Sequence, residues 1–247
     1  MIINTDKSTA MLIGSKKRLQ SGKCDFEILY NNCLLKNVTT EKLLGVTIDE
    51  AMSWSQHIDN LCSKISSRIG LLSRLRSYIP PKGLVMFYNG YVLPLFDYCC
   101  TVWGEKANKN IEKLFKLQKR AARYIMGARF DFPSKSLFKE LGWLTIYNRI
   151  KYHKGVLMFK CVNDMAPSYL CEMFTSTSES IAYSLRSTAS NGLFVPRPNT
   201  NFMKSTFQYS GTVLWNNIPA TVKSVNNIEM FKKKYFDYLI SQQDCEL

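Results

Sequence analysis

Apolar residues recur at helical spacing over a long stretch of the chain, and this pattern constrains the fold more than any other feature. The recurring residues are three or four positions apart, which places them on one face of an α-helix: Trp54, Ile58, Leu61, Ile65, Ile69, Leu72 and Leu75. Pro80-Pro81 ends the pattern, because proline lacks the N–H that a helix interior needs. The sequence therefore predicts one long amphipathic helix, with Ser53 and Gln56 forming a capping box at its start.

Other segments extend this mainly helical pattern. Pro81 opens an apolar segment that predicts one buried helix to about Trp103, kinked at Pro94. Further helices are expected at about 108–126, 134–141, 147–163, 209–216 and 227–240. Before residue 53, β-like runs predict strands at 8–15, 26–30, 33–35 and 43–49, with a turn at Asn31-Asn32. The expected fold class is mainly α with a small N-terminal antiparallel β-sheet (α+β).

The chain has 247 residues, enough for one large domain or two small ones with a sizeable core. The expected parts are residues 1–50, a small sheet, residues 51–127, a helical bundle, and residues 128–247, a smaller helical region. Residues 175–202 are rich in Ser, Thr, Asn and Pro and predict a loop with brief strands at 183–186 and 193–195.

The helix expected at 108–126 carries two stripes. Ile111, Leu114, Gln118, Ala121 and Ile125 form a stripe that packs. A second stripe, offset by two residues or about 200° around the helix, is basic: Lys109, Lys113, Lys116, Arg120 and Arg123. We call these five residues the basic ridge. Evenly spaced cations suit a phosphate backbone, so the ridge predicts a nucleic-acid contact. A solvated lysine face is the alternative, which acidic i,i+4 partners would favour, but Glu112 is the only acid in this segment.

Charge supports the same interpretation. The chain has 33 Lys and Arg against 19 Asp and Glu, for a net charge of +14. The excess is greatest in residues 50–126, which hold 12 basic and 5 acidic side chains. A field of this sign attracts polyanions such as nucleic acid. Its alternative role is solubility alone.

Other kinds of site lack a sequence signature. None of the eight cysteines forms a C-x-x-C pair, and His57 and His153 lie far apart, which argues against structural zinc. The cysteines fall in apolar helical patterns and suggest a reduced, intracellular protein of the cytoplasm or nucleus. No Asp-Asp pair, phosphate-binding glycine loop or nucleophile elbow occurs, so we expect no metal, no cofactor and no small-molecule substrate. No apolar stretch reaches the length of a membrane span, so no membrane partner is expected.

Six segments, in order, resemble the end of the polymerase of LINE-type (non-LTR, jockey-like) retrotransposons. They are TDKSTAMLIGSKKRL (Thr5 to Leu19), LLGVTIDEAMSWSQHIDNLCSKISSRIGLLSRLRSYIP (Leu43 to Pro80), FYNGYVLPLFDYCCTVWG (Phe87 to Gly104), LQKRAARYI (Leu117 to Ile125), ELGWLTI (Glu140 to Ile146) and FQYSGTVLWNNIP (Phe207 to Pro219).

This resemblance implies roles for particular residues. Residues 1–50 would be the end of a reverse-transcriptase palm, and residues 51–127 a thumb that holds the template–primer duplex of RNA and DNA. Lys7 would be an auxiliary palm lysine near the incoming nucleotide, and Leu44, Gly45 and Val46 a primer-grip-like hairpin. The family's magnesium-binding aspartates would precede residue 1, so Mg²⁺ is implied only for the full-length enzyme and this chain alone is expected to be inactive.

Two alternatives remain open at this stage. The chain could be a repurposed or relic protein-interaction module with no nucleic-acid role, whose basic faces meet acidic partners. Trp103, Trp143 and Trp215 could stack on bases, but they lie in apolar segments, which favours core packing. His57 is likewise expected to be structural, and neither His57 nor His153 has a sequence signature of a general base.

Overall fold

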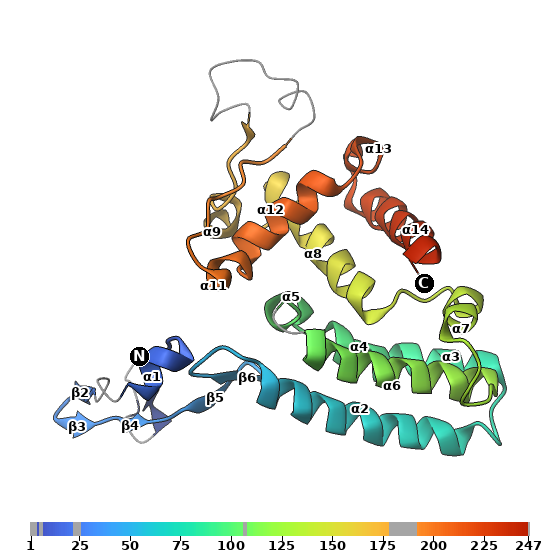
Figure 1. Cartoon of the computed structure of the whole chain (residues 1–247), viewed down its shortest axis with the longest axis horizontal. Helices are drawn as coiled ribbons and strands as arrows, with labels where there is room; N and C mark the ends of the chain where they lie inside the picture. The colour runs from blue at the N-terminus through green and yellow to red at the C-terminus, as the bar shows by residue number, and fades with distance from the viewer. Residues whose placement is uncertain (1–3, 5–6, 22–25, 106–107, 178–191, 247) are drawn as a thin grey trace. The chain divides into compact units, whose positions relative to one another are not determined.

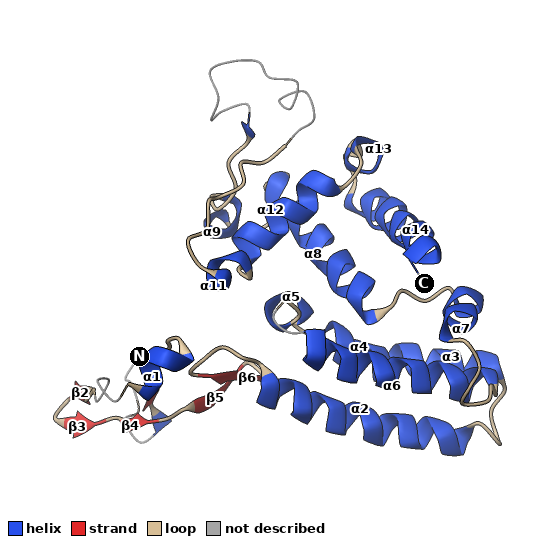
Figure 2. Ribbon diagram, viewed as in Figure 1, coloured by secondary structure: helices blue, strands red, loops and turns tan. Residues whose placement is uncertain are grey.

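The computed structural model describes residues 4, 7–21, 26–105, 108–177 and 192–246. They form a mainly helical protein with short strands in the N-terminal part (Figure 2). The chain divides into two compact units, residues 1–64 and residues 65–247. The expected fold class, mainly α with a small N-terminal antiparallel β-sheet, is confirmed. The three-part division at residues 50 and 127 stays a prediction.

Two β-hairpins of the first unit form around residues with positive φ. Asn31 and Asn32, with φ of 49° and 59°, connect β2 to β3 at the predicted turn. Leu44 and Gly45, with φ of 46° and 85°, connect β5 to β6, so the run expected at 43–49 folds back on itself. Positive φ at both central residues matches a type I′ turn, whose twist suits the flanking strands. A third pair, β1 with β4, is parallel. The strands are β1 (Thr9–Ala10), β2 (Leu29–Tyr30), β3 (Cys33–Leu34), β4 (Lys36–Asn37), β5 (Thr40–Leu43) and β6 (Val46–Asp49).

The strand predicted at 8–15 is wrong beyond Ala10. A short helix, α1 (Lys16–Gln20), follows the strand β1, and the Ser15 hydroxyl accepts a hydrogen bond from the Arg18 N–H at 3.4 Å. Serine at this position satisfies a helix N–H that has no partner inside the helix. The polar Lys-Lys-Arg sequence after it is a good helix former, which outweighs the β-like apolar residues before it.

The long helix predicted after residue 53 is α2 (Ser55–Leu75). Its apolar stripe is buried from Trp54 to Leu72, while Leu75 is half-buried. The predicted capping box is wrong. Instead, the Asp49 carboxylate accepts hydrogen bonds at 2.9 Å from the N–H groups of Ser53 and Trp54. Burial alone would raise the pKa of Asp49, but these backbone hydrogen bonds hold that pKa below its ordinary value.

The segment from Pro81 to Trp103 is not the single kinked helix that the sequence predicts. The helix α3 (Pro81–Phe87) runs into a π-helical turn, η2 (Tyr88–Val92), and then into α4 (Leu93–Asp97). The π turn lies just before Pro94, whose ring and missing N–H disrupt an α-helix. A full break follows, because Tyr98 is extended and Cys99 has a φ of 51°, and α5 (Cys100–Trp103) begins after it.

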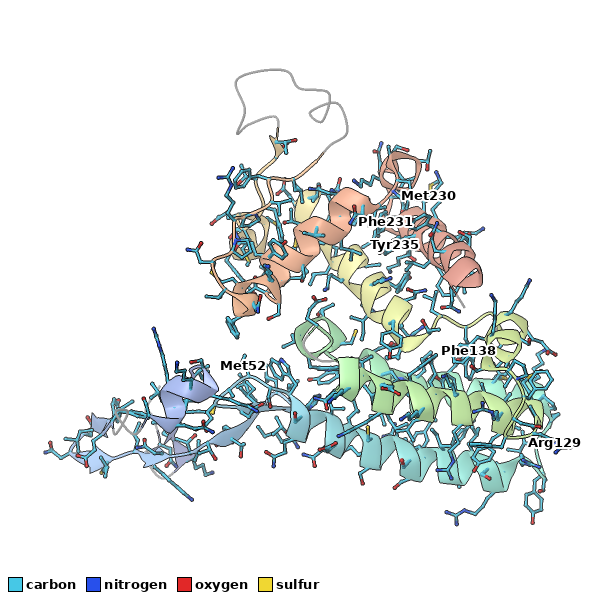
Figure 3. All side chains as sticks on the ribbon, in the orientation of Figure 1. Met52, Arg129, Phe138, Met230, Phe231 and Tyr235 are labelled. Atoms are coloured by element: carbon cyan, nitrogen blue, oxygen red, sulfur yellow. The ribbon has the colours of Figure 1, made fainter. Side chains whose placement is uncertain are left out.

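The centre of the second unit is α8 (Ile146–Val162), which packs against α4, α5, α6, α12 and α14. Phe159 on α8 stacks on Phe231 with ring centroids 4.4 Å apart, and Phe231 stacks on Tyr235 at 5.4 Å. Figure 3 labels Phe231 and Tyr235 on α14. Gly155 lets these helices approach closely, because a Cβ there would lie 2.3 Å from a Tyr235 ring carbon. The remaining helices are α6 (Asn108–Met126), α7 (Ser134–Leu141), α9 (Ser168–Cys171), α11 (Asn201–Lys204), α12 (Phe207–Asn217), α13 (Ala220–Lys223) and α14 (Ile228–Glu246) (Figure 1).

Only the ends of the loop-rich stretch can be compared with its prediction. The strand expected at 183–186 lies outside the described residues. Within the strand expected at 193–195, Leu193 forms an isolated antiparallel bridge with Ser176. The Asn216 side chain holds Leu193 from α12, because its amide and carbonyl bond the Leu193 carbonyl and N–H, each at 2.9 Å.

Candidate nucleic-acid interface

The helix α6 has the two faces that its sequence predicts. Its packing stripe is buried along its whole length, with Ile111, Leu114, Gln118, Ala121 and Ile125 each at most 4% exposed. On the opposite side, Lys109, Lys113, Lys116 and Arg120 are exposed. One side of α6 is therefore fixed in the core, and the fixed side determines where the basic side points.

One acid lies close to the basic ridge. Glu112 pairs with Lys116 at 3.3 Å, one helical turn away, and the two side chains are 54% and 72% exposed. An exposed i,i+4 pair of this kind contributes only about 0.3–0.5 kcal/mol and gives way readily to a stronger partner. The pair is the kind of contact that a solvated lysine face makes.

Arg123 differs from the other ridge residues. It is half-buried, its guanidinium lies 5.5 Å from the centroid of the Phe130 ring, and its Nη2 donates to the Phe132 carbonyl at 3.4 Å. Arg123 is therefore turned toward the connection between α6 and α7. The structure brings four ridge cations together on the exposed face and places the fifth at its C-terminal end.

Neighbouring groups report a positive field along α6. Burial lowers the pKa of Lys119 first, repulsion from Arg123 and Lys116 lowers it further, and attraction to Glu112 raises it in part. The pKa of Tyr124 is lowered mainly by its hydrogen bond from Arg120, with smaller contributions from Ser73 and Arg76. Arg76 follows α2, so the positive field extends from α6 to the end of that helix.

The residues singled out in the first unit are accessible, apart from Val46. Lys7 is exposed, and its backbone N–H donates to the Asn4 carbonyl at 3.3 Å. Leu44, at 83% exposed, and Gly45 form the tip of the β5–β6 hairpin, whereas Val46 is 6% exposed. The hairpin is thus present, and its role in gripping a primer stays a prediction.

The tryptophans and His57 are structural, as expected. Trp103, Trp143 and Trp215 are at most 9% exposed, so these rings pack in the core and not against bases. The indole of Trp143 stacks on the Tyr88 ring at 4.0 Å. His57 is buried, and its Nδ1 accepts a hydrogen bond from the Thr47 N–H at 3.3 Å.

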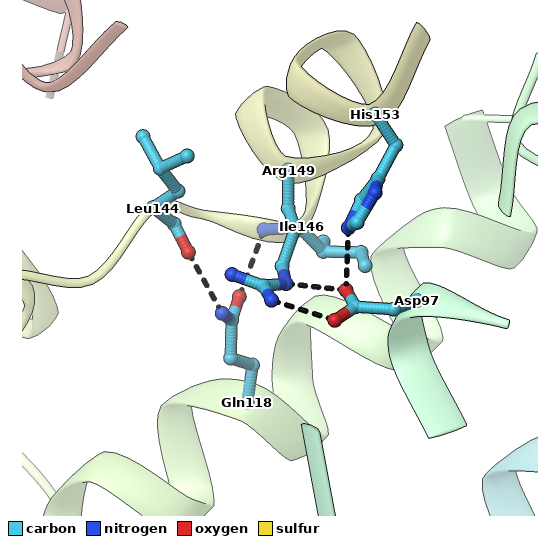
Figure 4. A network of polar contacts seen from close by, with 6 residues as sticks. All are labelled: Asp97, Gln118, Leu144, Ile146, Arg149 and His153. Atoms are coloured by element: carbon cyan, nitrogen blue, oxygen red, sulfur yellow. Dashed lines mark hydrogen bonds and ion pairs between the residues drawn. The ribbon is translucent and has the colours of Figure 1, made fainter. Parts of the chain in front are cut away.

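Sequence reasoning missed a polar network that fixes α6 against α8 (Figure 4). The Gln118 amide of α6 donates to the Leu144 carbonyl at 2.9 Å and accepts from the Ile146 N–H at 2.8 Å, at the start of α8. These two bonds satisfy backbone groups that would otherwise be buried without partners. These hydrogen bonds explain why a polar residue stands in the apolar stripe of α6: Gln118 joins α6 to the start of α8.

A second part of the network joins α4 to α8. Asp97 pairs with Arg149, whose Nη2 lies 2.6 Å from Asp97 Oδ2, and His153 Nε2 lies 3.0 Å from Asp97 Oδ1 (Figure 4). Burial would raise the pKa of Asp97, but hydrogen bonds from His153 and Arg149 hold that pKa below its ordinary value. Arg149 and His153 are four residues apart on a helix predicted from the sequence, which is a signal that they share a face.

Among the residues that the structure describes, no group of three or more His, Cys, Asp or Glu side chains is placed to hold a metal ion. No helix in the described part of the chain is both long enough and apolar enough to cross a membrane.

Comparison with known proteins confirms the predicted resemblance. The chain is 25% identical over 118 residues to the probable RNA-directed DNA polymerase from transposon X-element of Drosophila melanogaster, covering 46% of this chain and 13% of that protein. It is 24% identical over 142 residues to the RNA-directed DNA polymerase from mobile element jockey of the same species, covering 56% and 15%. Against the jockey polymerase of Drosophila funebris it is 27% identical over 135 residues, covering 51% and 15%.

These matches span only 13% to 15% of the length of those relatives. No protein-family model matches the chain, and no solved structure does.

Proposed function

We propose that this chain is a nucleic-acid-binding part of a retrotransposon RNA-directed DNA polymerase, and that its basic ridge holds a template–primer duplex. The observation that carries the proposal is the arrangement of α6. Lys109, Lys113, Lys116 and Arg120 are exposed on one side, and the other side is fixed by a buried stripe. The relatives, each named as an RNA-directed DNA polymerase, support a nucleic-acid partner.

The dimensions of the ridge suit a phosphate backbone. Lys109 and Arg120 are eleven residues apart, which is about 16 Å along a helix with a rise of 1.5 Å per residue. One strand of B-DNA places about five phosphates over that length of its axis. Each cation that neutralises a phosphate releases counterions, so four such contacts give a binding constant that depends strongly on salt.

A charge-reversal variant tests this proposal. Lys109, Lys113, Lys116 and Arg120 are changed to Glu together, and Arg123 is left in place because it packs on Phe130. We expect the variant to lose most of its affinity for an RNA–DNA hybrid in fluorescence anisotropy. The slope of log K against log salt should become shallower by about one for each lost phosphate contact.

The control carries the same change in net charge elsewhere. Arg197, Lys204, Lys233 and Lys234 are exposed, and changing them to Glu also takes the formal net charge from +14 to +6. The control should keep most of the affinity and the salt slope. Equal losses in both variants would mean that overall charge drives binding, and unchanged affinity in the ridge variant would favour the protein-interaction alternative. Far-UV circular dichroism checks that both variants are folded.

The roles in the first unit follow from the resemblance. We propose that the hairpin of Leu44, Gly45 and Val46 contacts the primer end through its exposed tip, Leu44 and Gly45. We further propose that Lys7 assists the incoming nucleotide in the full-length enzyme, where Mg²⁺ would act. The exposed tip of the β5–β6 hairpin supports the first role, because a leucine 83% exposed is available for contact. Polymerisation is not proposed for this chain alone, and extension of a primer by the purified chain with Mg²⁺ would contradict that view.

A further inference from the structure

The connection between α6 and α7 presents an aromatic ring to solvent. Phe130 is 90% exposed, the largest exposure among the bulky apolar side chains that the structure describes, and Phe132 is 43% exposed. Both follow the C-terminal end of the ridge helix directly. An exposed phenylalanine forgoes the favourable free energy of burial, and a partner that covered the ring would recover it.

The backbone of this connection is held in a defined turn. Gly127, with a φ of 62°, ends α6, and the Ala128 N–H donates to the Arg123 carbonyl at 3.0 Å. This bond spans the six residues from 123 to 128, as the 6→1 bond of a Schellman-type helix end does. The Phe132 N–H then donates to the Arg129 carbonyl at 3.2 Å, which places Phe130 at the second position of a β-turn. Phe130 is thus presented by a β-turn that is closed by one hydrogen bond and follows a hydrogen-bonded helix end.

A cation lies beside the Phe130 ring. The Arg123 guanidinium lies 5.5 Å from its centroid. Arg129, which is labelled in Figure 3, is the preceding residue. Asp131 is the acid in this turn, and it lies 3.5 Å from Arg129 Nε. Arg120 is one turn of helix before Arg123 and belongs to the ridge. This surface is therefore aromatic and positive, which suits an anionic partner that has flat apolar rings.

We infer that Phe130 is a stacking site for an unpaired nucleobase at the end of the duplex that the ridge holds. The inference rests on the proposed function. Inside a duplex the faces of each base are covered by its neighbours, so an exposed ring can stack only on a terminal or unpaired base. Aromatic stacking accepts any base because every base has a π-face, and cations beside the ring hold the flanking phosphates.

The test uses three synthetic RNA–DNA hybrids: one blunt, one with a single-stranded overhang, and one whose overhang lacks bases but keeps its phosphates. We expect F130A to lower affinity for the base-containing overhang by about 5- to 150-fold, the range for loss of one stacked base. Affinity for the blunt and abasic hybrids, which offer the ring no unpaired base, should change much less. The salt slope should also stay the same, because no phosphate contact is removed.

Two further variants make the result specific. Phe202 on α11 is 50% exposed, so F202A is a matched control that should bind all three hybrids as the unchanged chain does. F130W should keep the preference for the overhang. The four native tryptophans are all at most 9% exposed, so quenching of an exposed-indole emission by the base-containing overhang would report stacking at position 130.

The outcomes separate this inference from the proposed function. Equal affinity of F130A and the unchanged chain for the base-containing overhang would overturn the inference, as would equal losses on all three hybrids. If the ridge variant loses affinity while F130A does not, the inference fails alone. If the unchanged chain binds none of the hybrids, both fail.

Discussion

Replacement of Gln118 by methionine should destabilise the second unit strongly, although the exchange is nearly isosteric. Gln118 is 1% exposed, and its amide bonds the Leu144 carbonyl at 2.9 Å and the Ile146 N–H at 2.8 Å (Figure 4). Methionine has a similar helix propensity and can fill a similar volume. The exchange therefore removes two hydrogen bonds and changes little else.

The expected magnitude follows from the two backbone groups left behind. A buried polar group without a partner costs about 1–3 kcal/mol, so two groups cost about 2–6 kcal/mol. Burying a thioether in place of an amide offsets part of this, which leaves an expected loss of about 2–4 kcal/mol in the free energy of unfolding.

Urea unfolding followed by circular dichroism measures this loss as a lower midpoint with an unchanged slope. The matched control is Gln242, which is exposed on α14, and Q242M should change stability by less than about 0.5 kcal/mol. If Q118M were as stable as Q242M, the Gln118 bridge would not hold α6 to α8, and the orientation of the ridge would need another cause.

Two further substitutions test the packing around α8. D97N should destabilise the chain by about 3 kcal/mol at neutral pH, because it removes the negative charge that faces the Arg149 guanidinium in a mostly buried site. The folded pKa of Asp97 is depressed, so its contribution is present above the unfolded pKa of 3.8 and is lost as pH falls through the lower folded pKa. The difference in the free energy of unfolding between D97N and the unchanged chain should therefore become smaller below pH 4, as measured by urea unfolding at each pH. A difference that does not change with pH would contradict the ion pair. G155A should cost about 1–3 kcal/mol, because its Cβ would meet the Tyr235 ring at 2.3 Å. G70A is its control on α2, where a Cβ meets nothing within 4 Å, and should stabilise by up to about 1 kcal/mol in thermal unfolding; similar shifts in both variants would argue against the close approach of α8 and α14.

The spacing of apolar residues and the turn-forming residues predicted those helices and turns that are set by neighbouring residues in the sequence. The bounds of α6 and α7 agree with the spacing of their apolar residues, and the Asn31-Asn32 turn agrees with residues that tolerate positive φ. The break after Asp97 was not predictable in the same way. Cys99 adopts a φ of 51° in an apolar segment with no glycine at that point, so tertiary packing decides where the helix ends.

The candidate interface was predicted in part. Sequence spacing placed all five ridge residues on one side of α6, and four of them are exposed there. The fifth, Arg123, is drawn toward Phe130 and Phe132 by the turn that follows α6, and helical periodicity ends before that turn. The Asp97–Arg149 pair joins residues 52 positions apart, so no local pattern contains it.

The salt dependence of binding tests the central claim most directly. Binding of the unchanged chain to an RNA–DNA hybrid is measured by anisotropy from 50 to 200 mM salt. Four phosphate contacts predict a slope of log K against log salt of about −3.6, or a loss of affinity of about 150-fold over this range, if the hybrid behaves as B-DNA does. A slope near zero, or no binding at 50 mM salt, would contradict the account of α6 as a surface that holds nucleic acid.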